Sequence, residues 1–339
     1  MQTTRSPAPS SGTSSSGTSS SLFGGITLAA LAALIALPLI LPSATLATEI
    51  VIFAMAALAC NLLLGYTGLL SFGQAIFFGI GAYLSSLVMI HLGAGLIIAL
   101  VVAAIAGALA AALVGALAIR RTGIYFVMLT LAFTQLAYFI AYTAADWTGG
   151  DNGLLDVPRP PLALGGMVIA DLEPAVSYYI FVAALFLLLF VAARRIIGSP
   201  FGSTLVAIRE NPDRAAAVGY DTRQFKILAF TLSGAITGIA GALYAMLLHF
   251  APLSNIELPM SENILIMTII GGTGSLLGSL LGSTAIVLLG DWLSAIWPRW
   301  LMLLGIALIG VVIFMRGGLW GGIEGVVAKL RERRGGPEA

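Results

Sequence analysis

Charged side chains are scarce in this sequence. Only 9% of its 339 residues are Asp, Glu, Lys or Arg, whereas 59% are hydrophobic, and the mean hydropathy is +1.03. A soluble domain carries about 25% charged residues, so this chain has too little polar surface to face water on all sides. The composition therefore predicts a polytopic membrane protein.

Cysteine and histidine are almost absent as well. The single cysteine, Cys60, lies in an apolar run and cannot form an internal disulfide, so we interpret it as a small buried hydrophobic residue. The two histidines are far apart in the sequence, and no paired carboxylates, nucleophile with a base, or set of metal ligands is visible. We therefore expect neither an enzyme nor a metal site.

A phosphate-binding loop of the form G-x-x-x-x-G-K-[ST] is also missing. The stretch GGTGSLLG at 271–278 contains glycines but no lysine that could reach a phosphate. The chain therefore cannot hydrolyse ATP unaided, and we expect no cofactor in it. If it moves a solute against a gradient with ATP, the energy has to enter through a partner.

Long apolar stretches are abundant, and about 20 apolar residues suffice for a helix to cross a membrane. We predict spans at 24–42, 48–64, 71–91, 95–118, 123–143, 175–193, 226–248 and 299–315. Between the last two lies 262–290, whose first apolar half is short for a crossing and is followed by GGTGS at 271–275. There we expect a re-entrant hairpin or two thin crossings. The prediction is an all-α bundle of about 8–10 transmembrane helices with broken or re-entrant elements.

The distribution of positive charge predicts how the bundle is oriented. With both termini in the cytoplasm, only Arg159 and Arg299 fall outside, as the excess of positive charge in cytoplasmic loops requires. This orientation gives a cytoplasmic loop at 194–225 and an acidic external loop at 144–174.

The two ends of the chain differ in composition from the transmembrane domain predicted at 23–316. Residues 1–22 are rich in Ser, Thr, Gly and Pro and are predicted to be disordered, and 317–339 form a basic cytoplasmic tail. The apolar run after the first tail lacks a nearby basic segment and a convincing cleavage site, so we interpret it as a retained span.

The cytoplasmic loop contains the sequence pattern of two short helices. Ser199 precedes Pro200 and Asn211 precedes Pro212, which is typical of a cap residue followed by the first helical residue. Gly219 suits the left-handed position that ends the second helix. A loop resting on lipid headgroups would have a similar composition. The residues that we expect to contact a partner are Ser199, Pro200, Phe201, Gly202, Arg209, Glu210, Asn211, Gly219 and Asp221.

Polar residues within spans are costly and therefore indicate function. A glycine- and serine-rich stretch at 65–74 could break a helix, and Thr130, Thr134 and Tyr138 form a polar stripe at four-residue intervals. A seam of hydrogen bonds between helices is the structural alternative. We expect the translocation path to include Gly68, Ser71, Gly73, Gln74, Tyr125, Thr130 and Gln135.

The external loop contains TGGDNGL at 148–154. Its Gly149, Gly150 and Gly153 predict tight turns, and Asp151 supports turn geometry. The oxygen-bearing residues do not have the spacing of a calcium loop.

Four stretches, in this order, resemble one family. They are NLLLGYTGLLSFGQAIFFGIGAYL at 61–84, GIYFVMLTLAFTQLAYFIAY with TGGDNGL at 123–154, GSPFGSTLVAIRENPDRAAAVGYD at 198–221 with the span after it, and GGTGSLLGSLLGSTAIVLLGDWLS at 271–294. Together they are similar to permeases of ATP-binding-cassette importers, most of all to the LivM-type subunits of branched-chain amino acid transporters.

The resemblance implies a fold like that of type II importers, in the bacterial inner membrane, with 194–225 as the coupling loop inserted into a cytoplasmic ATPase. It implies a homologous LivH-type permease, two ATP-binding subunits that hold ATP and magnesium, and a periplasmic or lipid-anchored solute-binding protein that contacts the external loop. Leucine, isoleucine or valine would cross by alternating access. Membrane lipid is expected around the chain, and no nucleic acid.

Two other functions remain open from the sequence. Permeases for urea or short-chain amides belong to the same broad family. A stand-alone secondary carrier or channel is a different class, and a coupled carrier usually has an intramembrane acidic residue or histidine. The nearest carboxylates here, Glu49, Glu262 and Asp291, fall at the ends of predicted spans.

Overall fold

The structure is a computed structural model that describes residues 17–164 and 167–296, with single residues and short stretches between 299 and 325. Within these residues, seven helices are long and apolar enough to cross a membrane. They are α2 (Ala44–Thr67), α3 (Gln74–Leu92), α4 (Leu96–Ala118), α5 (Ile124–Thr143), α7 (Ala175–Ile197), α10 (Thr222–Leu248) and α12 (Leu276–Ile296). The predicted class, an all-α polytopic membrane protein, is confirmed.

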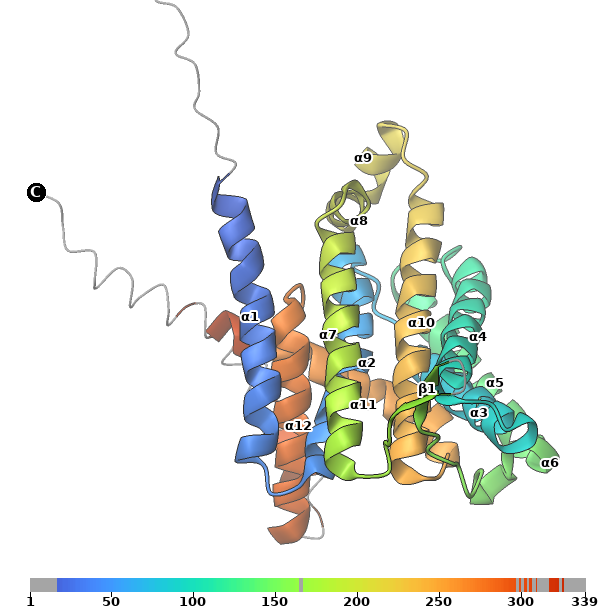
Figure 1. Ribbon diagram of the computed structural model, residues 1–339. Coiled ribbons are helices and arrows are strands. Elements are labelled where there is room, and N and C mark those ends of the chain that lie inside the picture. Colours follow the sequence, from blue (N-terminus) through green and yellow to red (C-terminus); the bar gives the residue numbers. More distant parts are fainter. Residues whose placement is uncertain are drawn as a thin grey trace, which may run out of the picture.

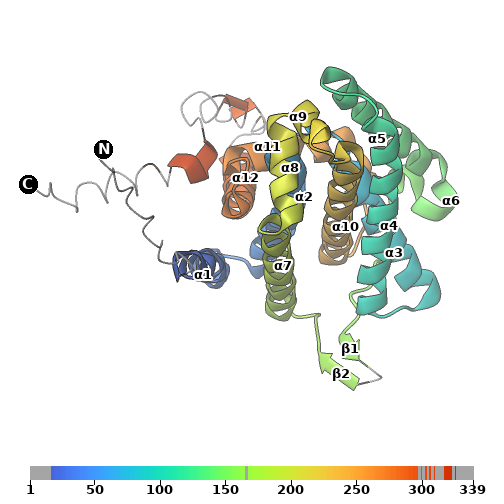
Figure 2. The same ribbon diagram turned by 90° about the horizontal axis from the view of Figure 1, so that it is seen from above.

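The helices are arranged so that the connecting segments gather at two ends of the bundle (Figure 1). One end has α8 (Pro200–Glu210) and α9 (Pro212–Ala217), and we name it the α8 end. The opposite end has the short helices α6 (Ala145–Thr148) and η1 (Gly150–Asn152), and we name it the α6 end. Seen along the helices, α1 (Gly17–Ile40) and α5 lie at opposite edges of the bundle (Figure 2).

Two boundaries differ from the sequence prediction. Helix α10 begins at Thr222, earlier than predicted, because the Asp221 side chain accepts hydrogen bonds from the backbone N–H groups of Arg223 and Gln224, both at 3.1 Å. Helix α1 begins at Gly17, inside the segment 1–22 that we predicted to be disordered. Serine costs a helix only about 0.5 kcal/mol relative to alanine, so an apolar helix extends into such a segment.

Other predictions fall on the ends of the chain. Residues 1–16 and most of 317–339 lie outside the described residues, and so does most of the predicted span at 299–315. The loop predicted to be external contains a small antiparallel hairpin of β1 (Leu162–Leu164) and β2 (Met167–Ala170), which the sequence did not predict.

Helix α10 packs closely against α3 and α4 through a face of small residues. A Cβ atom placed on Gly241 would lie 1.9 Å from the backbone oxygen of Phe78, and one on Gly238 would lie 2.4 Å from that of Ala103. Only glycine permits this approach, which is how transmembrane helices gain van der Waals contact in lipid. The close contact fixes α3, α4 and α10 as one unit.

The region predicted as a hairpin or two thin crossings folds as a short helix followed by a long one. Helix α11 (Leu258–Gly271) has 14 residues and is about 21 Å long, shorter than the hydrocarbon core of a membrane. After a tip at 272–275, helix α12 returns toward the α6 end (Figure 1). The tip lies beside the end of α2, because Gly274 accepts a hydrogen bond of 2.8 Å from the Tyr66 hydroxyl.

Candidate functional site

A break in the helical structure at 68–73 is the first feature of the site. Helix α2 ends at Thr67, and Gly68 follows with φ of 70°, a left-handed conformation that glycine adopts without strain. Helix α3 starts at Gln74 after Gly73. The stretch that we predicted to break a helix therefore does so.

The backbone N–H and carbonyl of Phe72, within this break, are held by side chains from two other helices. The Phe72 carbonyl accepts hydrogen bonds from the hydroxyls of Thr134 on α5, at 2.8 Å, and Ser261 on α11, at 2.5 Å. The Phe72 N–H donates to the Thr130 hydroxyl at 3.2 Å, and Ala75 N–H donates to that of Ser261 at 2.7 Å. Non-helical backbone in a membrane is tolerated where protein satisfies its polar groups in this way.

The position of Phe72 along α5 gives the depth of the break. Helix α5 has 20 residues and is about 30 Å long, and Thr130 and Thr134 are its seventh and eleventh residues. The Phe72 peptide therefore lies about 9–15 Å along α5 from its first residue. Because α5 is as long as the hydrocarbon core, the break and the first turns of α11 lie near the middle of the membrane.

Near this depth in the membrane, the surface of the chain carries three exposed polar side chains. Gln135 follows Thr134 and is exposed, and Glu262 and Asn263 follow Ser261 and are exposed too. Since the Thr134 and Ser261 hydroxyls share one acceptor, these three side chains start from neighbouring backbone positions on α5 and α11. The sequence placed Glu262 at a span end, which is wrong because α11 begins inside the bundle.

The predicted polar stripe on α5 divides between two faces. Thr130 and Thr134 are buried and form a hydrogen-bonded seam with the break. Tyr125, 70% exposed, and Gln135 lie on the outer face. The outer face is a continuous stripe at helical spacing, made of Tyr125, Met128, Ala132, Gln135, Phe139 and Tyr142. Thr130 and Thr134 of the predicted stripe therefore match the structural alternative, a seam of hydrogen bonds between segments of the chain, whereas Tyr125 and Gln135 lie on a different face.

Three other predicted path residues are buried inside the chain. Ser71 accepts a hydrogen bond from the Gly73 N–H at 3.1 Å. Gln74 is fully buried, and its amide donates to Ser233 at 3.1 Å and accepts from Thr237 at 2.8 Å. These bonds attach α3 to α10, so Gln74 does not face a solute in this conformation.

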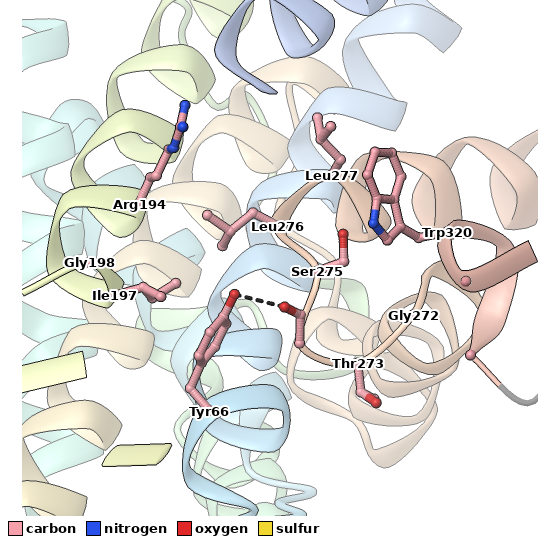
Figure 3. A pocket seen from close by; sticks show the side chains of 13 residues that line it. Tyr66, Arg194, Ile197, Gly198, Gly272, Thr273, Ser275, Leu276, Leu277 and Trp320 are labelled. Atoms are coloured by element: carbon pink, nitrogen blue, oxygen red, sulfur yellow. Dashed lines mark hydrogen bonds between the residues drawn. The ribbon is translucent and has the colours of Figure 1, made fainter. Parts of the chain in front are cut away.

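The sequence analysis missed Asn61, which holds the tip of the α11–α12 hairpin. Its amide donates to the Ser275 carbonyl at 2.7 Å, and its side-chain oxygen accepts from Gly274 N–H at 2.8 Å. Tyr66 bonds Gly274 from the same helix, and Figure 3 shows its hydroxyl directed at the loop. Asn61 is the one amide side chain in the mostly apolar α2, and this feature of the sequence could have indicated its role.

This tip borders a cavity at the α8 end. The cavity has a volume of about 580 Å3 and opens between the tip and the end of α7. Arg194, Tyr66 and Trp320 line it together with the backbone of the tip (Figure 3). The hairpin tip is therefore partly accessible from the α8 end.

Helices α8 and α9 have the predicted boundaries. Asn211 caps α9 by accepting a hydrogen bond from Arg214 N–H at 2.9 Å. Ser199 occupies the cap position of α8, but its hydroxyl donates back to the Ile196 carbonyl at 2.6 Å, so the predicted side-chain cap is absent. Gly219 has φ of 101°, the left-handed side that we predicted.

The two sides of this loop differ. Toward the bundle, Leu205 and Ile208 are buried, and Phe201 stacks on Phe225 with ring centroids 5.5 Å apart. Away from it, Val218 is 74% exposed and Tyr220 is 45% exposed, although both carry large apolar surfaces. An exposed apolar tip of this kind is typical of an interaction site.

Several residues predicted to contact a partner serve the fold of the loop itself. Gly202 is buried at the corner between α7 and α8, where a Cβ atom would lie 2.1 Å from the Ile197 oxygen. Pro200 is the first residue of α8, and Asp221 caps α10. Glu210 is exposed at the end of α8.

Arg209 contacts the helix break directly. Its guanidinium donates a hydrogen bond to the Gly65 carbonyl near the end of α2, and its methylene groups lie against Gly68. Gly65 also packs against Gly274 of the hairpin tip. Arg209, which we predicted to contact a partner, therefore links α8 to both irregular segments of the bundle.

The predicted turns at the α6 end are present. Gly149, Gly150 and Gly153 have φ of 76°, 57° and 66°. The buried Thr148 hydroxyl donates to the Ala141 carbonyl at 2.6 Å and fixes this turn on α5. Asp151 is exposed at the surface.

The geometry can be compared with known proteins. The family model for the permease component of branched-chain amino acid transport systems matches residues 43–314, which include the helix break, α5, the α8–α9 loop and the α11–α12 hairpin. The chain belongs to this permease family.

Relatives of this permease are permease proteins of bacterial transport and import systems. The LivM permease protein of the high-affinity branched-chain amino acid transport system is 26% identical over 71% of the chain in Escherichia coli and 25% identical over 72% in Salmonella typhimurium. The permease spans 61% and 62% of the lengths of these two relatives. The autoinducer 2 import system permease protein LsrC of Yersinia enterocolitica is 28% identical over 38% of the chain and 39% of its own length. No solved structure matches the chain.

Proposed function

We propose that this permease forms one half of the transmembrane channel of an ATP-driven importer, with the outer face of α5 and the start of α11 lining the solute route. The observation that carries the proposal is the exposure of Gln135, Glu262 and Asn263 near the middle of the membrane. Acidic residues facing lipid at this depth cost about 2.5–3.5 kcal/mol on insertion scales. A homologous permease subunit opposite this face would enclose the three side chains in a water-filled path.

The α8 end faces the cytoplasm in this proposal. Its helix ends and loops carry Arg120, Arg121, Arg194, Arg195, Arg209, Arg214, Arg223 and Lys226, and cytoplasmic loops are enriched in such residues. The exposed tip at Val218 and Tyr220 would dock onto one of two ATP-binding subunits, which hold ATP and magnesium. The turn at Asp151 would then face a solute-binding protein outside.

We further propose that the solute is a branched-chain amino acid. The Glu262 carboxylate favours a solute with an ammonium group over urea or an amide, because a charge-assisted hydrogen bond is about twice as strong as a neutral one. The LivM relatives act in branched-chain amino acid transport. Import of autoinducer 2 is the second candidate, because the LsrC relatives serve that system.

Reconstituted uptake tests this proposal. The permease is placed in liposomes with a homologous permease, two ATPases and a solute-binding protein from its genetic neighbourhood, and accumulation of labelled leucine is measured with ATP on the side of the ATPases. We expect ATP-dependent uptake that isoleucine and valine inhibit and urea does not. Uptake by the permease alone, driven by a proton gradient, would contradict the proposal.

A further inference from the structure

Three cationic side chains converge on a single cavity under the α8–α9 loop. Arg121, Arg209 and Lys226 line a cavity of about 200 Å3, and they come from the α4–α5 connection, from α8 and from α10. The lining contains no aspartate or glutamate. Not every cation of this end lines the cavity, since the exposed Arg195 does not.

The charge of this cavity is not neutralised by the chain as described. Arg209 donates to the Gly65 carbonyl, and among the described residues neither Arg121 nor Lys226 has a hydrogen bond or an ion pair from its side chain. The acidic residues nearest in sequence to Arg209 on this loop, Glu210 and Asp213, are exposed and do not line the cavity. Like charges that share a small cavity repel one another, so an anion bound between them would be favoured.

The depth and chemistry of the cavity indicate which anion fits. The cavity is bordered by Thr67 at the end of α2, Ile119 after α4 and Gly123 before α5, which are the points where apolar helices end. Phospholipid headgroups lie at this level of a membrane. Guanidinium groups bind phosphate oxygens in a bidentate manner, and a lysine adds a point charge.

We propose that Arg121, Arg209 and Lys226 form a binding site for a phosphate group beneath the α8–α9 loop. The phosphate is carried by an anionic phospholipid headgroup or is free in solution. When bound, it joins the α4–α5 connection, α8 and α10 through one anion, so that the α8–α9 loop is held more firmly on the bundle. The site does not depend on which solute the permease moves.

Binding to the purified full-length chain tests the site. Native mass spectrometry in detergent counts retained phosphatidylglycerol, with phosphatidylcholine as the uncharged reference, and a thermal shift assay titrates inorganic phosphate against chloride at equal ionic strength. The variants are Arg121→Gln and Lys226→Gln. Arg195→Gln is the matched control, because it removes an exposed cation of the same end that does not line the cavity.

We expect Arg121→Gln and Lys226→Gln each to weaken binding about tenfold, and Arg195→Gln to bind as the unchanged chain does. Retention of phosphatidylglycerol without a response to phosphate identifies a lipid site, and a thermal shift with inorganic phosphate identifies a site for the free ion. Equal binding by all four proteins overturns the proposal. Arg121→Lys keeps the charge but lacks the guanidinium group, so it is expected to bind more tightly than Arg121→Gln and less tightly than the unchanged chain. An unchanged unfolding temperature of each variant without ligand separates loss of the site from misfolding.

Discussion

The guanidinium of Arg209 donates a hydrogen bond to the backbone carbonyl of Gly65, which joins the α8–α9 loop directly to the end of α2. The same Gly65 packs against Gly274 at the tip of the α11–α12 hairpin. Arg209 therefore connects α8 to these two irregular segments, and α2 and α11 lead from them into the bundle.

Replacing Arg209 by alanine removes this connection. A hydrogen bond to a charged group contributes about 1.5–3 kcal/mol, so we expect about a tenfold fall in solute moved per ATP hydrolysed, with ATPase activity retained. Uptake and phosphate release are measured together in proteoliposomes. Arg195→Ala serves as the control, and an equal loss in both variants would show that Arg209 has no special role.

Two glutamines that the sequence predicted to lie in the path are expected to behave in opposite ways. Gln74→Leu leaves the buried Thr237 hydroxyl without its acceptor and should lower the free energy of unfolding by about 1–2 kcal/mol. Gln135→Leu changes an exposed position and should leave stability unchanged while lowering uptake. Thermal unfolding and uptake are measured for both variants. Normal uptake by a stable Gln135→Leu protein would assign Gln135 to a lipid or subunit contact.

Glu262→Gln keeps the shape of the side chain and removes its charge. If Glu262 binds an ammonium group, the KM for leucine should rise about tenfold, because the charge-assisted hydrogen bond is replaced by a neutral one. Initial uptake rates over a range of solute concentrations measure the change. Asp291→Asn, at an exposed position of α12, is the control. An unchanged KM would remove Glu262 from the solute route.

The close contact between α10 and α3 predicts a strong effect of a single methyl group. In Gly241→Ala the Cβ atom would meet the Phe78 oxygen at 1.9 Å, so the helices must separate, and we expect a loss of about 1–3 kcal/mol or more in stability. In Gly95→Ala nothing lies within 4 Å and φ is −70°, so no clash arises, and we expect stability to change by less than about 1 kcal/mol, since the only cost is that alanine is a poorer residue than glycine at this helix cap. Thermal unfolding in detergent distinguishes the two.

Much of the architecture could be predicted from the sequence, because apolar length and helix punctuation act locally. The spans that became α2 to α5 and α7, the break after α2, and the two proline-started helices of the loop follow from residues adjacent in sequence. Asn211 and Gly219 have the predicted backbone roles for this reason.

The candidate site was less predictable, because it depends on which face of a helix meets which neighbour. Thr134 and Gln135 are adjacent in sequence, yet one is buried against Phe72 and the other is exposed. The depth of Glu262 follows from the bond between Ser261 and Phe72, two residues separated by most of the chain. The position of Arg209 on Gly65 is likewise a long-range contact that no local pattern encodes.

The Phe72 carbonyl, shared by Thr134 and Ser261, has a mechanical consequence. Together with the Phe72 N–H, which donates to Thr130, it restrains α5 near the midpoint of that helix. A tilt of α5 that keeps these bonds moves the two ends of the helix in opposite directions. Opposite displacements at the α6 end and the α8 end can therefore come from one movement of one helix.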